Sequence, residues 1–395
     1  MHMAKILVYR WKAYNYIDVM STFAKMGYEI DEISQPLMNY DVDEEFGEIL
    51  RCKIRSDVYD FVFSINYFGI ISDICQELGV RYVAWSCDSP MISMHHDSVF
   101  NSCNRIFVFD RSNCLEFETY GAQNVYYLPL GVNVDRIKKL MATVDTVNPM
   151  SFYENDISFV GSLYEKNSYD DIYEKLPEYL RGYFDAVIEA ALESGEGGLH
   201  EKLLTSDVLN ELEGYFEFVR SSPGSFSNLE LVFANNTLGF KIAREERIRN
   251  LIEISKKYKV GLYTGSATDN LIRVENRGPV DYWKEMPRVF ANSKINLNMT
   301  IPNIKTGIPL RIWDVMGAGG FLLTNHQLEL DLYFVDGEDL VSYSDKYDMM
   351  EKIDFYLRNE SQRHKIAESG FAKVAKYHTY DERIKYMLQI LKDCK

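Results

Sequence analysis

Positive charge is scarce in this 395-residue sequence, and the scarcity bears on its partners. Lysine and arginine total 43 against 59 aspartates and glutamates, which leaves a formal net charge of −16. Sustained binding to a nucleic-acid backbone requires clustered cations, so this balance argues against a nucleic-acid partner. It does not argue against a small anionic ligand, because a helix N-terminus and a few local cations are enough to hold a phosphate.

Long apolar runs and metal-binding cysteine patterns are missing as well. No run approaches the roughly 18 apolar residues of a membrane span, and the N-terminal apolar run meets Arg10 and Lys12 instead of a signal-cleavage site. No C-x-x-C pair occurs, and no histidine stands at a zinc-like spacing from a cysteine. We therefore expect a cytoplasmic protein without a transmembrane segment or a metal site, whose six cysteines are reduced thiols. They are Cys52, Cys75, Cys87, Cys103, Cys114 and Cys394.

Strand-like and helix-like segments alternate along the chain, which is too long for one ordinary core. Apolar runs typical of buried strands occupy residues 4–9, 28–33, 59–65, 81–87, 105–110 and 124–131, and a second series occupies 156–164, 259–265, 294–300 and 320–325. Helical periodicity fills several of the intervals, for example 16–27 and 69–79, each of which ends on a glycine. The alternation predicts two α/β domains, each with an open, mostly parallel sheet and helices on both faces.

Residues 167–240 interrupt the second series with helical periodicity, so we expect a helical insertion in the second domain. The sequence leaves three roles open for it: covering a face of the sheet, joining two subunits into a homodimer, or recognising a second substrate. We expect the first domain to span residues 1–150 and the second to span 151–375. Neither low-complexity tracts nor internal repeats are present.

The polar residues that follow the predicted strands are the first candidates for a site, because ligands of open α/β sheets bind beyond the carboxyl ends of the strands. No G-x-G-x-x-G follows the strand at 4–9, which argues against a nicotinamide or flavin enzyme. Asp88 follows the strand at 81–87, where a carboxylate is placed to take a proton from a hydroxyl. The alternative is that its D-S-P sequence is only a turn. His95 and His96 come next, and such an adjacent pair is expected to face solvent.

A phosphate-binding pattern follows the strand at 156–164 in the second domain. The strand turns at Gly161 and Ser162, and Lys166 stands a few residues further on. Backbone N–H groups at such a turn, together with one lysine, suit a diphosphate.

The stretch TGIPLRIWDVMGAGGFLLTN, residues 306–325, carries a stronger pattern. Thr306 and Gly307 form a loop ahead of a predicted helix, with Arg311 in its first turn and Asp314 one turn further on. The loop N–H groups and Arg311 are placed to neutralise a pyrophosphate, and Asp314 is placed to accept the hydroxyls of a ribose. The alternative is an Arg–Asp pair that stabilises the helix at the surface by about 0.2–0.5 kcal/mol.

These blocks, taken in order, resemble the CgeB-like (spore-maturation type) glycosyltransferase family and, more broadly, the retaining-type GT-B glycosyltransferases. The blocks that carry the resemblance are FVGSLYEK, LYTGS, the run from VDYWKEMP to GFLLTN, DGEDLVSYSD and YHTYDERIKYML in the second domain, with RYVAWSCDSP and VYYLPLGVN in the first. They cover most of the chain apart from the insertion. The resemblance implies the GT-B fold, in which two Rossmann-like lobes face a cleft. In this fold the helical insertion expected from periodicity falls in the C-terminal lobe, and the resemblance implies that a C-terminal helix, residues 376–395, packs back on the N-terminal lobe.

The resemblance also implies an activity. A cytoplasmic, metal-independent glycosyltransferase of this kind takes a sugar from a nucleoside-diphosphate donor and passes it to a hydroxyl of a protein or a cell-surface glycan. UDP is the expected nucleotide, with dTDP and GDP as alternatives. In related enzymes two acidic residues eight positions apart flank the donor. Asp314 matches the second, which holds the ribose, whereas Thr306 occupies the first position. Asp88 would be the base of an inverting reaction, or would position acceptor or donor if the configuration is retained.

Two other function classes remain open at the level of sequence. A sugar-nucleotide epimerase shares the two-lobed architecture and would show no dependence on an acceptor, although a threonine at position 306 does not favour it. In a non-catalytic protein that binds nucleotide sugars, the change Asp88→Asn would leave the function unaltered.

Overall fold

The computed structural model describes residues 4–195 and 197–393, and the chain folds into two compact units. Unit 1 gathers the chain up to Leu130, the segment Phe218–Val232 and the chain from Tyr380 onward, whereas unit 2 contains Gly131–Glu217 and Phe233–Thr379. The chain therefore passes between the units four times, after residues 130, 217, 232 and 379. Residues 131–150, which the sequence interpretation places in the N-terminal domain, lie in unit 2.

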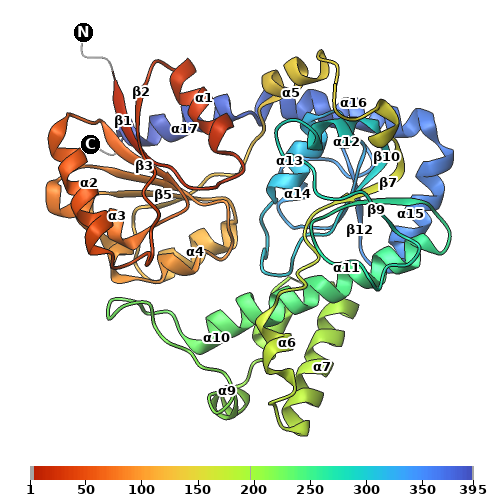
Figure 1. The fold of residues 1–395 in the computed structure, drawn as a ribbon, viewed down its shortest axis with the longest axis horizontal. Coiled ribbons are helices and arrows are strands. Elements are labelled where there is room, and N and C mark those ends of the chain that lie inside the picture. The colour runs from red at the N-terminus through yellow and green to blue at the C-terminus, as the bar shows by residue number, and fades with distance from the viewer. Residues whose placement is uncertain (1–3, 196, 394–395) are drawn as a thin grey trace. The chain divides into compact units, whose positions relative to one another are not determined.

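Unit 1 is built on a six-stranded parallel sheet in the order β2-β1-β3-β4-β5-β6 (Figure 1). Its strands are β1 (Lys5–Tyr9), β2 (Glu29–Ile33), β3 (Phe61–Ile65), β4 (Tyr82–Trp85), β5 (Asn104–Val108) and β6 (Val125–Tyr127). Its helices are α1 (Tyr16–Lys25), α2 (Glu44–Ser56), α3 (Gly69–Leu78), α4 (Arg111–Thr119), α10 (Leu229–Val232) and α17 (Tyr380–Asp393), with short 3₁₀ turns at Ile92–Met94 and Asp97–Phe100. Helices α2 and α3 pack together on one face of the sheet, and α1 and α17 pack together on the other.

The strands of unit 1 follow the predicted apolar runs, because β3 and β4 are buried along their whole length. Helices α1 and α3 end just before Gly27 and Gly79, whose positive φ angles of 91° and 67° suit glycine. Helix α2 was not predicted. Asp43 caps it by accepting a hydrogen bond from the N–H of Phe46, a signal that lies in the sequence at D-E-E-F.

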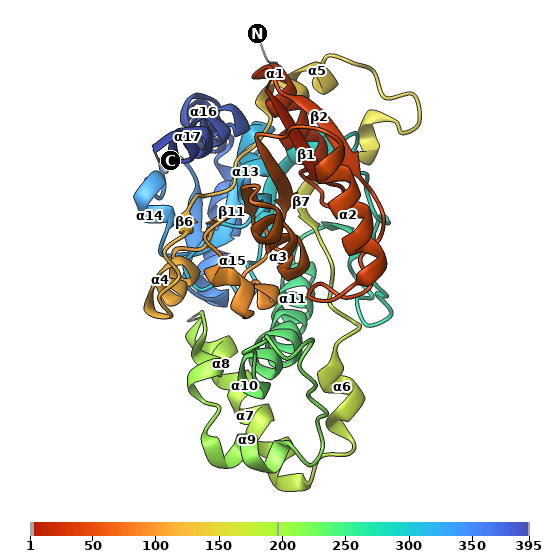
Figure 2. The ribbon, with the colours of Figure 1, turned by 90° about the vertical axis from the view of Figure 1, so that its left-hand side faces the viewer.

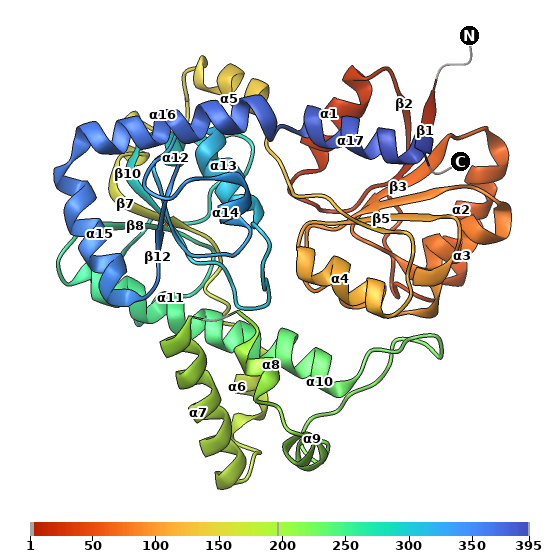
Figure 3. The same ribbon diagram turned by 180° about the vertical axis from the view of Figure 1, so that it is seen from behind.

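Unit 2 holds a second six-stranded parallel sheet, in the order β12-β11-β10-β7-β8-β9. Its strands are β7 (Asn155–Val160), β8 (Val260–Tyr263), β9 (Glu275–Asn276), β10 (Ser293–Asn298), β11 (Leu322–Asn325) and β12 (Val341–Tyr343). Its helices outside the insertion are α5 (Val134–Met141), α11 (Phe240–Ser255), α12 (Met286–Asn292), α13 (Leu310–Gly317), α14 (Leu330–Tyr333), α15 (Lys346–Arg358) and α16 (Glu360–Tyr377). Helix α15 packs on β10 and β12, and α16 packs on α13 and α15 (Figure 3). The predicted fold class, two α/β domains with parallel sheets, is confirmed.

The insertion lies between β7 and α11 of unit 2 and contains α6 (Ser168–Tyr173), α7 (Glu178–Ser194), α8 (Leu199–Lys202) and α9 (Ser206–Leu212). Figures 1 and 2 show α6, α7 and α9 grouped on the side of α11 that faces away from the sheet. The helical prediction is wrong for residues 213–228, which contain no helix and include the turn-forming sequence S-S-P-G. The chain then resumes as α10 and a π-helix, Phe233–Gly239, that runs directly into α11.

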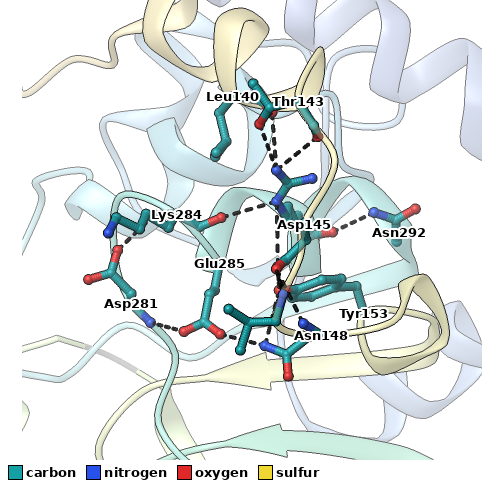
Figure 4. Close-up of polar contacts among 11 residues, drawn as sticks. Leu140, Thr143, Asp145, Asn148, Tyr153, Asp281, Lys284, Glu285 and Asn292 are labelled. Carbon is teal, nitrogen blue, oxygen red and sulfur yellow. Dashed lines mark hydrogen bonds and ion pairs between the residues drawn. The ribbon is translucent and has the colours of Figure 1, made fainter.

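A polar network fastens the segment after α5 to helix α12 within unit 2 (Figure 4). The buried guanidinium of Arg288 donates to the carbonyl oxygens of Leu140 and Thr143 at 3.2 and 3.0 Å. The amide of Asn148 donates to Glu285 at 2.7 Å, and the hydroxyl of Tyr153 donates to Asp145. These bonds explain why residues 131–150 belong to unit 2.

Gly320, just ahead of β11, offers a test of how tightly unit 2 is packed. A Cβ at this position would lie 2.6 Å from the carbonyl oxygen of Phe290 and 2.6 Å from the amide nitrogen of Asn296. We expect Gly320→Ala to lower the free energy of unfolding by about 1–3 kcal/mol, because backbone cannot move aside cheaply.

The matched control for Gly320→Ala is Gly182→Ala in α7, where a Cβ would meet no atom within 4 Å. Alanine there should stabilise the helix by up to about 1 kcal/mol. Urea unfolding of the three proteins measures both effects. A Gly320→Ala protein as stable as the parent would contradict the close packing of β11 against α12.

Among the described residues, no helix is both long and apolar enough to cross a membrane. The five described cysteines, Cys52, Cys75, Cys87, Cys103 and Cys114, are free thiols, as predicted. Cys394 lies outside the described residues. Desolvation raises the pKa of the buried Cys75 and of the half-buried Cys87 well above the ordinary thiol value, which disfavours their thiolate forms at neutral pH.

Candidate active site

The strand order of unit 2 defines where a ligand would bind. The chain runs from β7 outward through β8 and β9, then returns to the other side of β7 with β10, β11 and β12. The switch point of the sheet therefore lies between β7 and β10, and ligands of open α/β sheets bind at the carboxyl ends of the strands at this point. The loops that follow β7 and β10 are the two candidate regions of the sequence.

The loop after β7, residues 161–166, differs from the expected turn in one respect. The N–H of Gly161 donates to Tyr263 O at 3.1 Å, the N–H of Leu163 donates to Ser266 Oγ at 2.9 Å, and the N–H of Tyr164 donates to Ser162 Oγ at 3.0 Å. These three donors are already used inside the chain. The loop therefore offers a ligand its cationic side chains more than a row of N–H groups.

Cationic side chains gather around this loop. Lys166 is exposed, and the hydrogen bond from Ser266 holds the pKa of Glu165 below its ordinary value, with the charges of Arg244 and Lys166 acting in the same direction. Arg244 and the buried Arg247 come from α11, three residues apart on one face of the helix. The sequence interpretation missed both, because the insertion separates them from the loop along the chain.

The loop between β10 and α13 contains the predicted pair Thr306 and Gly307. The hydroxyl of Thr306 donates to Oε1 of Glu329 at 2.8 Å, and the N–H of Glu329 donates back to Thr306 O at 3.1 Å. Glu329 is 2% exposed. Thr306 occupies the position where the family pattern has an acidic residue. The carboxylate of Glu329 is hydrogen-bonded to the Thr306 hydroxyl and therefore lies next to that position.

The insertion supports the same loop from the other side. The amide of Asn303 donates to Asn235 O of the π-helix at 2.7 Å, and Lys305 Nζ forms an ion pair with Glu201 of α8 at 2.6 Å. π-helical turns are frequent at functional sites. Covering the sheet is therefore not the whole role of the insertion, which also holds the loop ahead of α13.

Asp314 lies in the second turn of α13 and is 4% exposed, so the surface Arg–Asp pair is wrong for this residue. Its Oδ1 accepts a hydrogen bond from Tyr282 Oη at 2.9 Å. The expected helix is confirmed from Leu310 to Gly317, and Trp313 and Met316 pack in the core.

Arg311, in the first turn of α13, makes its described contacts with α12. Its Nη1 lies 3.0 Å from the sulfur of Met286, and its guanidinium lies 5.4 Å from the ring centre of Phe290. The side chain is half-buried. In this conformation the guanidinium stacks on α12, so contact with a phosphate at the helix N-terminus would require it to turn.

Unit 1 places Asp88 at the carboxyl edge of its own sheet. Asn66 follows β3 with a φ of 66°, and its Nδ2 donates to Oδ2 of Asp88 at 2.7 Å. Its Oδ1 accepts from the N–H of Cys87 at 2.8 Å. The surrounding chain partly desolvates the Asp88 carboxyl, although the residue keeps an exposed edge, and this raises the pKa of the carboxyl above its ordinary value; the Asn66 hydrogen bond opposes the rise. A fixed carboxylate whose pKa is shifted towards neutrality has the properties of a general base.

The expectation that His95 and His96 face solvent is wrong, since they are 3% and 7% exposed. The segment Phe218–Val232 of the same unit covers them: Phe226 packs against the His95 ring, and Ser225 forms an antiparallel bridge with His96. A Cβ on Gly224 would lie 2.6 Å from Nε2 of His96, so the approach requires glycine. Their role in the structure is packing.

No cluster of three or more histidine, cysteine, aspartate or glutamate side chains suited to a metal occurs within residues 4–195 and 197–393. The predicted site residues thus fall into two groups, one in each unit. Gly161, Lys166, Thr306, Gly307, Arg311 and Asp314 belong to unit 2, and Asp88 belongs to unit 1.

Comparison with known proteins identifies the class of this fold. Residues 244–389 match the model of a family described as glycosyl transferase-like. This span contains α11 from residue 244 onward, the loop ahead of α13 and Asp314. Curated protein sequences give no match.

Solved structures resemble the whole chain at low sequence identity. Sucrose-phosphate synthase from Thermosynechococcus elongatus matches with a TM-score of 0.57 and 9% identity over 99% of this chain and 98% of that one. HepE from Anabaena, in complex with UDP and glucose, matches with a TM-score of 0.56 and 9% identity over 99% and 100%. A trehalose-6-phosphate synthase matches with a TM-score of 0.54 and 11% identity over 98% and 99%. The fold is that of the GT-B glycosyltransferases.

Proposed function

We propose that this protein is a glycosyltransferase that moves a sugar from a nucleoside-diphosphate donor to a hydroxyl of a protein or a cell-surface glycan. The match of residues 244–389 to a glycosyl transferase-like family carries the proposal, because it covers the loop and helix with the predicted donor residues. This match favours a transferase over an epimerase or a non-catalytic binding protein.

The donor site proposed in unit 2 contains Gly161, Lys166, Thr306, Gly307, Arg311 and Asp314. UDP is the preferred nucleotide, since HepE of the same fold holds UDP in one structure and UDP-glucose in another. dTDP and GDP are the alternatives. Lys166 and the N-terminus of α13 would stabilise the charge that develops on the departing diphosphate. Asp314 would accept the ribose hydroxyls.

Thr306 is proposed to contact the sugar of the donor. The hydroxyl of Thr306 donates its proton to Glu329, so in a contact with a sugar hydroxyl its oxygen would act as the acceptor. Asp88 is the proposed base for the acceptor hydroxyl in an inverting reaction, and a positioning group if the configuration is retained. The reaction is proposed to need no metal.

Three finer assignments accompany this function. The family is the CgeB-like, spore-maturation type, the compartment is the cytoplasm, and unit 1 is the acceptor-side domain. A homodimer is the expected assembly if the exposed side of the insertion joins two copies. Sedimentation velocity of the purified protein tests the last assignment directly.

A thermal-shift panel of nucleoside diphosphates and their sugars tests the donor site. At ~100 times its dissociation constant, a ligand that binds only the folded protein stabilises it by about 2.7 kcal/mol. We expect UDP or dTDP, and their sugars, to raise the unfolding midpoint, and adenosine diphosphate to serve as the mismatched control.

A second measurement separates transfer from binding alone. Incubation with the stabilising nucleotide sugar in the absence of acceptor should release nucleoside diphosphate slowly, because water replaces the acceptor hydroxyl. If no nucleotide shifts the midpoint, the donor site is wrong; if binding occurs without any release or transfer, the protein is a binding protein and not an enzyme.

A further inference from the structure

Arg247 of α11 joins the two loops that flank the switch point of unit 2. Its Nη1 donates to Ser162 O at 2.7 Å and its Nη2 donates to Met299 O at 2.8 Å. Ser162 lies just beyond β7, and Met299 lies just beyond β10. One side chain thus fixes the spacing between the ends of neighbouring strands, where the proposed function places the diphosphate.

The guanidinium of Arg247 is buried, with 8% of the residue exposed. The hydrogen-bond partners described for its Nη1 and Nη2 are backbone carbonyl oxygens and not carboxylates. Its Nε lacks a hydrogen-bond acceptor. Desolvation raises the pKa of the neighbouring Glu246 to about 7, so that carboxyl offsets the charge only in part at neutral pH. Buried charges in proteins are normally paired, and here the neighbouring carboxyl supplies only part of the balancing negative charge.

The same side chain also holds the shape of the loop after β7. Its guanidinium lies 4.8 Å from the ring centre of Tyr164, whose φ of 52° is strained for a tyrosine. The Tyr164 ring also stacks on Phe240, with ring centres 4.9 Å apart and an interplanar angle of 14°. Tyr164 and Phe240 flank the insertion, so this stack closes its base.

We propose that Arg247 is a positioning residue for the donor diphosphate, which supplies the rest of the balancing negative charge. By binding two carbonyl oxygens it turns their negative ends away from the ligand. It also holds the loop that carries Lys166 in the conformation that receives the phosphates. This role rests on the proposed function. It predicts that changes at Arg247 affect the binding of the diphosphate but not the binding of the nucleoside.

The test compares the binding of UDP with the binding of uridine by calorimetry. Arg247→Lys keeps the charge but cannot bridge two carbonyls with a planar fork. We expect this substitution to lower the affinity for UDP about tenfold and to change the affinity for uridine by less than about twofold. A purely structural defect would lower both affinities alike. Arg249→Lys is the matched control: Arg249 lies on the same helix and binds Glu189 of α7 at 2.6 and 2.8 Å, away from both loops.

Tyr164→Gly provides an independent variant in case Arg247→Lys does not fold. Glycine adopts the positive φ without strain but removes the stacked ring, so the loop loosens while Arg247 stays. This variant should also lower the affinity for UDP more than the affinity for uridine. An unchanged ratio of UDP to uridine affinity in the folded variants would overturn the role of Arg247 and leave the donor site intact. Failure of the unaltered protein to bind any nucleoside diphosphate would overturn the donor site and this role together.

Discussion

Replacing Asp88 with asparagine is expected to lower kcat for sugar transfer by about 10²–10⁴, the range that general-base catalysis contributes. Asparagine has nearly the shape of aspartate but cannot accept the proton of the acceptor hydroxyl. Because Asp88 lies in unit 1 and the donor residues lie in unit 2, donor binding should not change. Initial rates of transfer, together with the UDP-induced shift of the unfolding midpoint, measure the two quantities separately.

The pH dependence of the transfer rate provides a second test of Asp88. Its carboxyl must be ionised to act as a base, so the rate should fall as the pH drops through its raised pKa. Asn66→Asp keeps an acceptor for the N–H of Cys87 and tolerates the positive φ, but it replaces the donor to Asp88 with a like charge. The acid limb of the rate profile should therefore move to higher pH.

An Asp88→Asn protein with normal transfer rates would show that its D-S-P sequence is only a turn. The surrounding hydrogen bonds would then have a structural purpose alone. They include Ser86 Oγ to Asp88 O at 2.8 Å and Ser89 Oγ to Asp110 at 2.9 Å.

Removing the Asp314 carboxylate is expected to abolish the nucleotide-induced stabilisation. Two charge-assisted hydrogen bonds to a ribose are worth about 1.5–3 kcal/mol each, so a loss of about 100-fold in affinity is a conservative expectation for Asp314→Ala. A ligand that stabilises the parent by about 2.7 kcal/mol would then stabilise the variant by about 0.4 kcal/mol at the same concentration. Thermal unfolding with and without UDP provides the measurement.

Because Asp314 is buried, its replacement also needs controls for simple destabilisation. Tyr282→Phe removes the 2.9 Å hydrogen bond to Asp314 but leaves the carboxylate for the ribose, so it should bind UDP as the parent does. The parent should also prefer UDP over 2′-deoxyuridine diphosphate, and Asp314→Asn should narrow that preference. Equal UDP responses of Asp314→Ala and the parent would remove Asp314 from the site.

The sequence predicted most strands of the sheets because the central ones, such as β3 and β4, are apolar and buried along their whole length. Helices α1 and α3 were recognised by the glycines that follow their last turns. Short elements escaped prediction for a physical reason. β9 has two residues, both exposed, and β12 has three, so neither provides a periodic pattern long enough to recognise. The region 213–228 looked helical from its apolar spacing, but it forms turns and irregular chain, and from Phe218 onward it belongs to unit 1.

The candidate site was predicted only where its residues are local in sequence. Thr306, Gly307 and Asp314 stand within one loop and helix, so their grouping could be inferred directly. Arg247 and Glu329 reach the site from distant segments through hydrogen bonds of the folded chain, to Ser162 and Thr306 respectively. Residue spacing in the sequence does not predict such contacts between distant segments.

The fourfold passage of the chain between the units limits how the protein can be divided. A fragment that ends near residue 130 would lack α17, whose Tyr380 packs on Trp85 and whose Leu391 carbonyl accepts from Arg81 at 2.8 Å. It would also lack the segment Phe218–Val232 that buries His95 and His96. Neither half of this molecule is therefore encoded as a contiguous piece of the gene. Transplanting unit 1 into another protein of this fold would require three grafted segments.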